Sequence, residues 1–178
     1  MPGCGKSTVG RHLARQLGLR FLDSDAEIEH RSGMPVRDFF ATRGEAAFRD
    51  VEQDVIDELS SWPDAVLATG GGAVLRPSNR DALHSRSHVF YLRNTPEELH
   101  RRLRHDHHRP LLQVADPLAR LRELYRERDP LYRRTAHFVI EAARPSVSSL
   151  ISMVLMQLEL AGLVDSSPGG GTDSGASH

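Results

Sequence analysis

Short apolar runs that alternate with helical patterns constrain the fold of this chain more than any other feature. Apolar runs predict four strands, at residues 19–22, 65–69, 89–92 and 138–140. Amphipathic periodicity predicts helices over residues 9–17, 26–31, 36–42, 45–59, 77–85, 97–104, 118–127 and 147–160. Strands separated by helices in this way form a mostly parallel sheet, so the fold class is α/β.

Composition bounds the kind of protein. The 178 residues, 39% hydrophobic and 26% charged, fit a single globular domain. A net charge of −1 gives no reason to expect nucleic-acid binding. The single cysteine, Cys4, excludes an internal disulfide, and no run of about 18 apolar residues is present to span a membrane. We therefore expect a cytoplasmic monomer without nucleic-acid or membrane partners.

A glycine-rich segment at the start of the chain matches the C-terminal part of the phosphate-binding pattern G-x-x-x-x-G-K-[ST]. It comprises Gly3, Cys4, Gly5, Lys6, Ser7 and Thr8. Glycine amides and a helix N-terminus bind phosphate, Lys6 would reach the β- and γ-phosphates of ATP, and Ser7 would ligate Mg²⁺. Of the 23 basic residues 22 are arginine, which suggests that position 6 needs a compact ammonium. The alternatives are chance use of lysine and a ligand-free helix start.

The pattern is incomplete, because its first glycine and the strand that delivers the loop would precede Met1. Losing about four buried aliphatic side chains would cost on the order of 6–12 kcal/mol. That loss is comparable with the whole stability of a domain, about 5–15 kcal/mol. We expect that the start site is misassigned and that the chain as written folds weakly and binds ATP poorly.

Three further clusters carry recognisable chemistry. Asp23 and Asp25 follow the first predicted strand, where alternating carboxylates can face different ligands. Arg49 and Glu52 are neighbours on one helix face, and the carboxylate can orient the guanidinium toward an acid. Three glycines, Gly70 to Gly72, follow a strand and indicate close backbone approach to a ligand. The competing interpretations are an N-cap role for Asp25, a weak surface ion pair, and a flexible turn.

Taken in order, six segments of the sequence resemble shikimate kinases. They are GCGKST (3–8), D-S-D-x-x-I (23–28), F-R-x-x-E (48–52), the triple glycine (70–72), R-P-L-L (109–112) and R-D-P-L-Y (128–132). The resemblance implies a three-layer P-loop kinase fold with a five-stranded parallel sheet, flanking helices and a mobile lid, the first strand being absent here. It implies a kinase domain over 1–164, with the lid at about 105–116 and a shikimate-binding subregion at about 25–60. The segment 165–178 is too poor in apolar residues to fold.

The resemblance also implies an activity and residue roles. The activity is ATP-dependent phosphorylation of the 3-hydroxyl of shikimate, a step of chorismate and aromatic amino-acid biosynthesis, with one Mg²⁺ per subunit. Lys6, Asp25 and Arg109 would be catalytic, Asp23 would hold the Mg²⁺ hydration shell, and the glycine triplet with Asp25, Arg49 and Arg128 would bind shikimate. Nucleotide contacts would come from the phosphate loop, Arg102, Arg109 and Pro145; supporting roles would fall to Glu52, Phe40 and Phe48.

Several alternatives remain open at this point. Arg126, Arg133 or Arg134 could take the role of Arg128, Arg102 could be a helix-surface charge, and Phe40 and Phe48 could be core residues. Glu141 to Arg144 depart from the family's usual I-D-T start before Pro145. His105, His107 and His108 lack metal-ligand spacing and fit a solvated lid better. The rival functions are another small-polyol kinase, such as a gluconate kinase, and a non-catalytic nucleotide-binding remnant.

Overall fold

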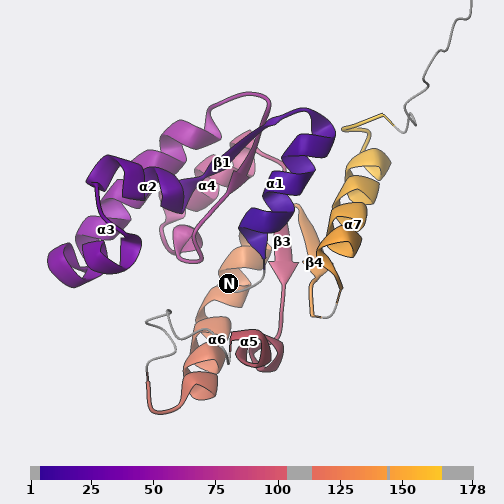
Figure 1. Ribbon diagram of the computed structural model, residues 1–178. Coiled ribbons are helices and arrows are strands. Elements are labelled where there is room, and N and C mark those ends of the chain that lie inside the picture. Colours follow the sequence, from indigo (N-terminus) through magenta and orange to yellow (C-terminus); the bar gives the residue numbers. More distant parts are fainter. Residues whose placement is uncertain (1–4, 104–113, 144, 166–178) are drawn as a thin grey trace, which may run out of the picture.

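Four strands form two separate parallel pairs in this computed structural model, which describes residues 5–103, 114–143 and 145–165 (Figure 1). β1 (Arg20–Asp23) pairs with β2 (Ala65–Ala68), and Phe21 lies opposite Val66. β3 (Phe90–Arg93) pairs with β4 (Phe138–Glu141). The four predicted strands are confirmed, whereas a five-stranded sheet is not found among the described residues.

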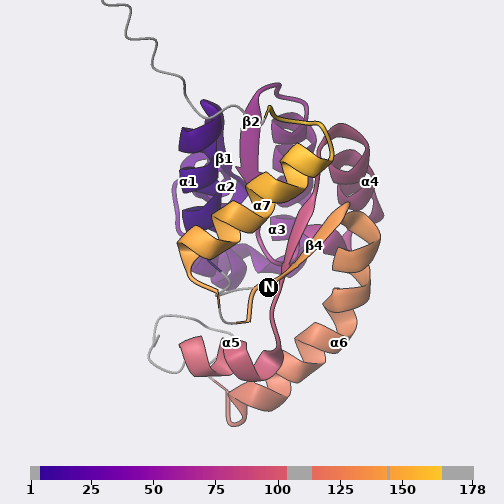
Figure 2. The same cartoon turned by 90° about the vertical axis from the view of Figure 1, so that its right-hand side faces the viewer.

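Helices cover both sides of the strands, which confirms the α/β class. They are α1 (Lys6–Leu17), α2 (Ser24–Ser32), α3 (Val36–Ser60), the 3-10 turn η1 (Ala73–Leu75), α4 (Pro77–Arg86), α5 (Pro96–Leu103), α6 (Pro117–Thr135) and α7 (Val147–Leu160). Figures 1 and 2 place α1 and α7 on one side of the strands and α3 and α4 on the other. The main apolar cluster joins α1 and α7 to β3 and β4 through Val9, Leu13, Leu92, Ile140, Leu150 and Val154.

Local sequence signals account for most element boundaries. α1 ends at Gly18, whose φ of 66° is favourable only for glycine. Thr95 caps α5 by accepting a hydrogen bond from the Glu98 amide at 3.2 Å, and Pro96 is its first residue. α3 is interrupted at Gly44, with φ 82° and ψ 171°, so the two helices predicted over 36–42 and 45–59 are confirmed.

α6 differs from its prediction, because it continues through Pro130 to Thr135 instead of ending near residue 127. A proline inside a helix removes one backbone hydrogen bond. The last turn still forms because Tyr132 and Thr135 are buried and Asp129 pairs with Arg133 at 2.8 Å. Tertiary packing therefore outweighs the proline signal.

β2 is less buried than its sequence suggests, because a nearly continuous apolar run is typical of a strand buried on both faces. Only Ala68 is fully buried, and Ala65, Val66 and Leu67 are half-buried. One edge of β2 faces a cavity of about 610 Å³ that separates the two strand pairs. We call this the inter-sheet cavity; it is lined by residues 65–70 of the β2 segment, residues 87–92 of the β3 segment and residues of α1, α4, α6 and α7.

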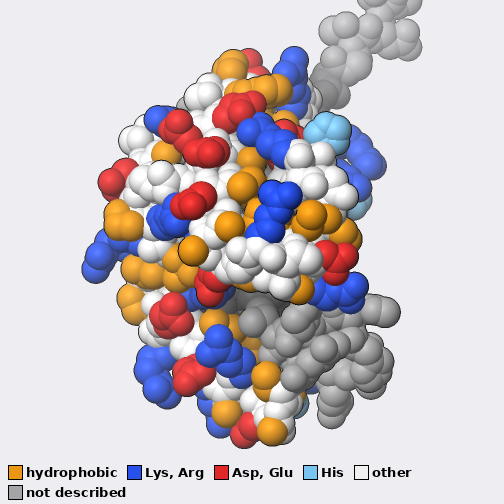
Figure 3. Space-filling model, turned by 90° about the vertical axis from the view of Figure 1, so that its left-hand side faces the viewer, with side chains coloured by type: hydrophobic (Ala, Val, Ile, Leu, Met, Phe, Trp, Pro, Cys, Tyr) orange, Lys and Arg blue, Asp and Glu red, His pale blue; other side chains and the backbone are white. Residues whose placement is uncertain are grey.

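The surface is mixed in charge. In the space-filling view of Figure 3, acidic and basic side chains are interspersed over the described part of the face, in keeping with the net charge of −1. Within the described residues, no helix combines the length and apolar character needed to cross a membrane.

Candidate active site

The predicted phosphate loop leads into the start of α1, which we call the phosphate end of the candidate site. Gly5 precedes the helix with φ 74°, so Lys6, Ser7 and Thr8 form its first turn, where backbone amides point toward the start of the helix. Such amides, with the helix dipole, favour anions. Ser7 Oγ donates to Asp23 Oδ2 at 2.8 Å, which joins α1 to the carboxyl end of β1. Gly3 and Cys4 lie outside the described residues.

The Asp23 carboxylate is held from two directions. Its Oδ1 accepts hydrogen bonds from the amides of Asp25 (3.0 Å) and Ala26 (3.1 Å), and its Oδ2 accepts from Ser7. Asp23 is therefore the N-cap of α2, and the alternative that gave this role to Asp25 is wrong. One carboxylate and one hydroxyl at the loop are a donor set that suits Mg²⁺, which prefers oxygen ligands and retains water.

Asp25 lies against the glycine triplet. A Cβ added at Gly70 would fall 2.6 Å from Asp25 Oδ1, so only glycine permits this approach. Burial raises the pKa of the Asp25 carboxyl, and the Lys6 ammonium partly opposes that rise, whereas the charges of Asp23 and Glu29 add to it. Asp25 is thus a desolvated carboxyl beside the phosphate end, with more basic character than an exposed aspartate.

Arg49 lies against the other end of the same triplet. A Cβ at Gly72 would overlap the Arg49 guanidinium. Arg49 Nη1 donates to Glu52 Oε1 at 2.8 Å, and Nη2 donates to Glu45 Oε1 at 3.2 Å. Side-chain exposure is 12% for Arg49 and 1% for Glu52, so the interpretation as a surface ion pair is wrong. Burial raises the pKa of Glu52, and the Arg49 charge opposes this shift.

Phe40 and Phe48 form the apolar support of the guanidinium. The Arg49 guanidinium carbon lies 5.6 Å from the Phe40 ring centroid and 5.3 Å from that of Phe48. The centroids of the Phe40 and Phe48 rings are 4.4 Å apart, and Phe48 is buried in a cluster with Ile28 and Val55. Both residues therefore pack in or against this core, and both also contact Arg49.

Arg128 differs from the neighbouring arginines of α6. Its Nε is buried and has no hydrogen-bond partner among the described residues. Its charge acts on Glu52, which places it on the side of the Arg49 pair. Arg126, Arg133 and Arg134 are exposed, and Arg133 is paired with Asp129. Of the four candidates, Arg128 alone is partly buried, and its Nε is a buried donor without a partner among the described residues.

Comparison with known proteins shows the family to which the chain belongs. The shikimate kinase family profile matches residues 2–159. A shikimate kinase of Paracidovorax citrulli is 60% identical over 94% of this chain and 93% of its own length. The chain belongs to the shikimate kinase family. A shikimate kinase of Burkholderia pseudomallei is 57% identical over 91% of this chain and 88% of its own length.

Solved structures of the family have the same fold. The shikimate kinase of Acinetobacter baumannii, in complex with shikimate, has a TM-score of 0.84 and 46% identity, covering 90% of this chain and 89% of that one. The enzyme of Aquifex aeolicus has a TM-score of 0.80 at 29% identity, over 92% of this chain and 95% of that one. The chain therefore has the P-loop kinase fold of shikimate kinases, an ATP-dependent phosphotransferase family.

Two residues that sequence reasoning missed hold the glycine triplet of this family member in place. The Gly70 amide donates to Oγ of Ser24, which is fully buried, at 3.1 Å. The Tyr132 hydroxyl donates to the Gly71 carbonyl, and its ring stacks on Tyr91 with a centroid distance of 4.8 Å. Ser24 lies between the two aspartates, and Tyr132 ends the R-D-P-L-Y segment. Their positions inside these motifs are the sequence signal that could have identified them.

The structure brings together only some of the residues that were predicted to contact the nucleotide. Arg102 donates from Nη2 to the carbonyls of Ala142 and Ala143, both at 3.1 Å. This contact joins α5 to the segment that leads to Pro145, while Arg102 itself is exposed on α5, as the helix-surface alternative expects. Arg109 and the three histidines of the predicted lid lie outside the described residues.

Proposed function

We propose that this chain transfers the γ-phosphoryl group of ATP to the 3-hydroxyl of shikimate. The convergence of Asp25 and Arg49 on opposite ends of the glycine triplet carries the proposal. A carboxylate that orients a hydroxyl and a guanidinium that binds an acid are the two groups needed for a cyclic hydroxy acid. The shikimate-bound relative from A. baumannii, similar over 90% of this chain, supports the same substrate.

The acid of the substrate would bind between Arg49 and Arg128. Glu52 and Glu45 orient the Arg49 guanidinium before any ligand arrives, which lowers the ordering cost of binding. The Arg128 Nε has an unused donor in a buried position. Two guanidinium groups can each form charge-assisted hydrogen bonds with one carboxylate.

Asp25 would orient the attacking hydroxyl and accept its proton. Desolvation raises its pKa, which makes it a better proton acceptor than an exposed aspartate once it is ionised. The Gly70 amide, fixed by Ser24, keeps the backbone beside this carboxylate. Phosphoryl transfer would then proceed in line by positioning and electrostatic stabilisation, without a covalent enzyme intermediate.

The triphosphate of ATP would bind at the N-terminus of α1. Lys6 and the amides around it would contact the terminal phosphates, and Gly3, Cys4, Gly5 and Thr8 complete the proposed loop. Ser7 and Asp23 would hold one Mg²⁺, which supplies positive charge to the phosphate oxygens when bound. Arg109 would stabilise charge on the transferring group, and Arg102 and Pro145 would lie at the adenine.

The remaining parts of the proposal concern organisation. We assign residues 1–164 to one kinase domain, residues 25–60 to the shikimate-binding subregion and residues 105–116 to the lid. We further propose that the protein acts as a cytoplasmic monomer on small-molecule substrates, without nucleic-acid or membrane partners.

A coupled ATPase assay with shikimate and with gluconate tests this function. We expect turnover with shikimate only, and Asp25→Asn should lower kcat by about 10²–10⁴-fold, the usual contribution of a general base. Asp54→Asn, an exposed position on α3, is the matched control and should leave kcat unchanged. Turnover with gluconate alone, or binding of ATP without turnover of either acid, would contradict the proposal.

A further inference from the structure

Asp129 of α6 is a carboxylate that ties this helix to β3. The Tyr91 hydroxyl of β3 donates to Asp129 Oδ1 at 2.9 Å, and Arg133 Nε donates to Asp129 Oδ2 at 2.8 Å. Arg93 Nε lies 3.6 Å from Oδ1. Burial acts to raise the pKa of the Asp129 carboxyl, but the hydrogen bonds from Arg133 and Tyr91 outweigh burial and hold that pKa below its usual value. Asp129 is therefore an ionised acceptor, although its side chain is only 14% exposed.

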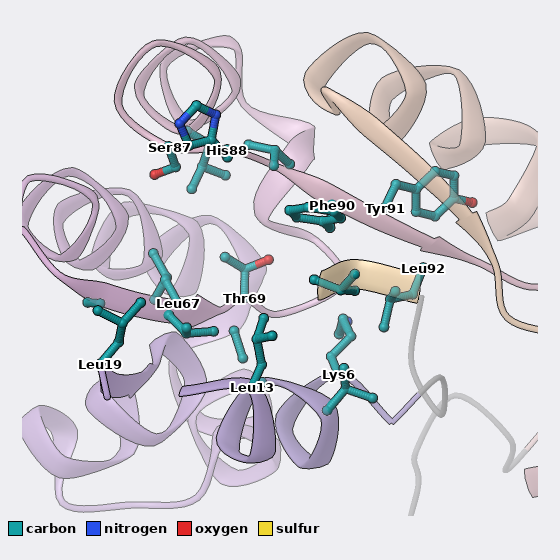
Figure 4. A pocket seen from close by; sticks show the side chains of 18 of the residues that line it. Lys6, Leu13, Leu19, Leu67, Thr69, Ser87, His88, Phe90, Tyr91 and Leu92 are labelled. Atoms are coloured by element: carbon teal, nitrogen blue, oxygen red, sulfur yellow. The ribbon is translucent and has the colours of Figure 1, made fainter. Parts of the chain in front are cut away.

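The Tyr91 side chain lies on the α6 side of β3. Successive residues of a strand point to opposite faces. Leu92 packs in the cluster of α1 and α7, whereas Tyr91 packs with Tyr132 of α6. In Figure 4, which looks into the inter-sheet cavity, the Tyr91 hydroxyl points away from Lys6. Burial and the hydrogen bond to Asp129 raise the pKa of the Tyr91 hydroxyl, so it remains a hydrogen-bond donor at neutral pH.

Three successive contacts join Asp129 to the glycine triplet. The first is the hydrogen bond that Tyr91 donates to Asp129. The second is the stacking of the Tyr91 ring on the Tyr132 ring, with centroids 4.8 Å apart. The third is the hydrogen bond that the Tyr132 hydroxyl donates to the Gly71 carbonyl. Both tyrosines are buried, so a displacement of one ring is transmitted to the other through close packing.

Pro130 makes the side-chain contacts of this part of α6 more important. It lies between Arg128, proposed to bind the substrate acid, and Tyr132. Proline has no backbone N–H, so α6 lacks one of the hydrogen bonds that would join these turns. Asp129 directly follows Arg128 and lies about one turn before Tyr132 on the same helix face. The contact of Asp129 with β3 therefore acts on both of these neighbours.

We propose that Asp129 and Tyr91 are positioning residues for the acid end of the site, where the substrate carboxylate would bind between Arg49 and Arg128. Asp129 fixes the Tyr91 ring, and Tyr91 fixes the Tyr132 ring against the glycine triplet. The same contacts set the position of the α6 turn that carries Arg128. The two residues act through their neighbours, without contact with the acid. This inference rests on the proposed function, because it assigns both residues to shikimate binding.

Kinetic constants of Tyr91 and Asp129 variants of the full chain test this role. Tyr91→Phe keeps the stacked ring and removes the donor, so the KM for shikimate should rise about 2- to 10-fold. The kcat and the KM for ATP should stay within about twofold, as expected for a loss confined to acid binding. Asp129→Ala should raise the KM for shikimate at least as much. Asp129→Asn, which keeps an oxygen acceptor for Tyr91, should recover most of that loss, and the double variant Tyr91→Phe/Asp129→Ala should be no worse than Asp129→Ala.

Two control variants on α6 separate positioning from a general loss of stability. Tyr125→Phe removes a hydroxyl that accepts from Arg93 at 2.9 Å and should leave the KM for shikimate within about twofold. Thr135→Val removes a buried hydroxyl that donates to the Leu131 carbonyl at 2.8 Å, so it should lower the melting midpoint without changing this KM.

The outcomes distinguish this inference from the proposed function. An unchanged KM for shikimate in Tyr91→Phe, additive effects in the double variant, an equal rise in the KM for ATP, or the same rise in Thr135→Val would overturn the positioning role while the proposed function stands. If the unsubstituted chain does not turn over shikimate, the proposed function fails, and the positioning role fails with it.

Discussion

The two ends of the candidate site are held in different ways. At the acid end, Arg49 is bound by Glu45 and Glu52 and packs on two phenylalanine rings. At the phosphate end, Ser7 is exposed and contacts Asp23 through a single hydrogen bond of 2.8 Å. The proposed acid end is therefore organised by the chain's own buried contacts, whereas the proposed phosphate end is an exposed helix start, a geometry that favours anions. Substitutions should separate the two ends through the kinetic constants that they change.

The largest effect is expected at the phosphate end, from Lys6→Arg. The broad guanidinium keeps the charge but replaces a compact ammonium at the helix start, so kcat should fall by about 10²–10³-fold. The KM for shikimate should change little. Arg11→Lys, the reverse exchange on the exposed face of the same helix, serves as the control. Near-normal kcat would remove the phosphate role from Lys6.

At the acid end, Arg49→Ala should raise the KM for shikimate by about 30-fold or more. Truncating one member of a buried charge pair costs about 2–5 kcal/mol, and here it also leaves Glu52 unpaired. The KM for ATP should stay within about twofold. Arg37→Ala, on the exposed side of α3, is the control. A larger change for ATP than for shikimate would place the acid site elsewhere.

Tyr132→Phe should have a smaller effect at the same end. It removes the hydroxyl that donates to the Gly71 carbonyl but keeps the ring that stacks on Tyr91. One hydrogen bond is worth about 0.5–1.5 kcal/mol, so the KM for shikimate should rise about 2- to 10-fold. Tyr125→Phe, which removes a hydroxyl that accepts from Arg93 and forms no hydrogen bond with the glycine triplet within the described residues, should not reproduce this rise. If it does, the effect is general loosening of α6.

The smallest expected change is a shift in a pH profile. Asp25 must be ionised to accept a proton, so activity falls on acidification through its raised pKa. The Glu29 charge contributes to that raised pKa, hence Glu29→Gln should lower the pKa of Asp25 and move the acid limb of kcat to lower pH. Glutamine keeps an oxygen acceptor for the Val36 amide. Glu27→Gln, on the same helix but paired with Arg31, should leave the limb in place.

Elements with strong local signals could be predicted from the sequence. The threonine before α5 and the proline at its first position, the glycine that interrupts α3 and the amphipathic run of α7 place those helices within a few residues. The end of α6 could not be predicted, because the burial of Tyr132 that carries the helix past Pro130 depends on its contact with Tyr91, 41 residues earlier in the chain. Long-range packing of this kind leaves no mark in a local window.

The same division holds for the site. The sequence alone was enough to select four sets of candidate residues: the phosphate loop, the paired aspartates, the Arg49–Glu52 pair and the glycine triplet. Each can be recognised from its residue types and their short separation along the chain. Only the tertiary structure decided that Asp23 caps a helix, that Glu52 is buried, and that Ser24 and Tyr132 hold the glycines. It also decided that the four strands form two pairs about an apolar cavity. These properties depend on which surfaces meet across the fold, and that is set by the packing of distant segments.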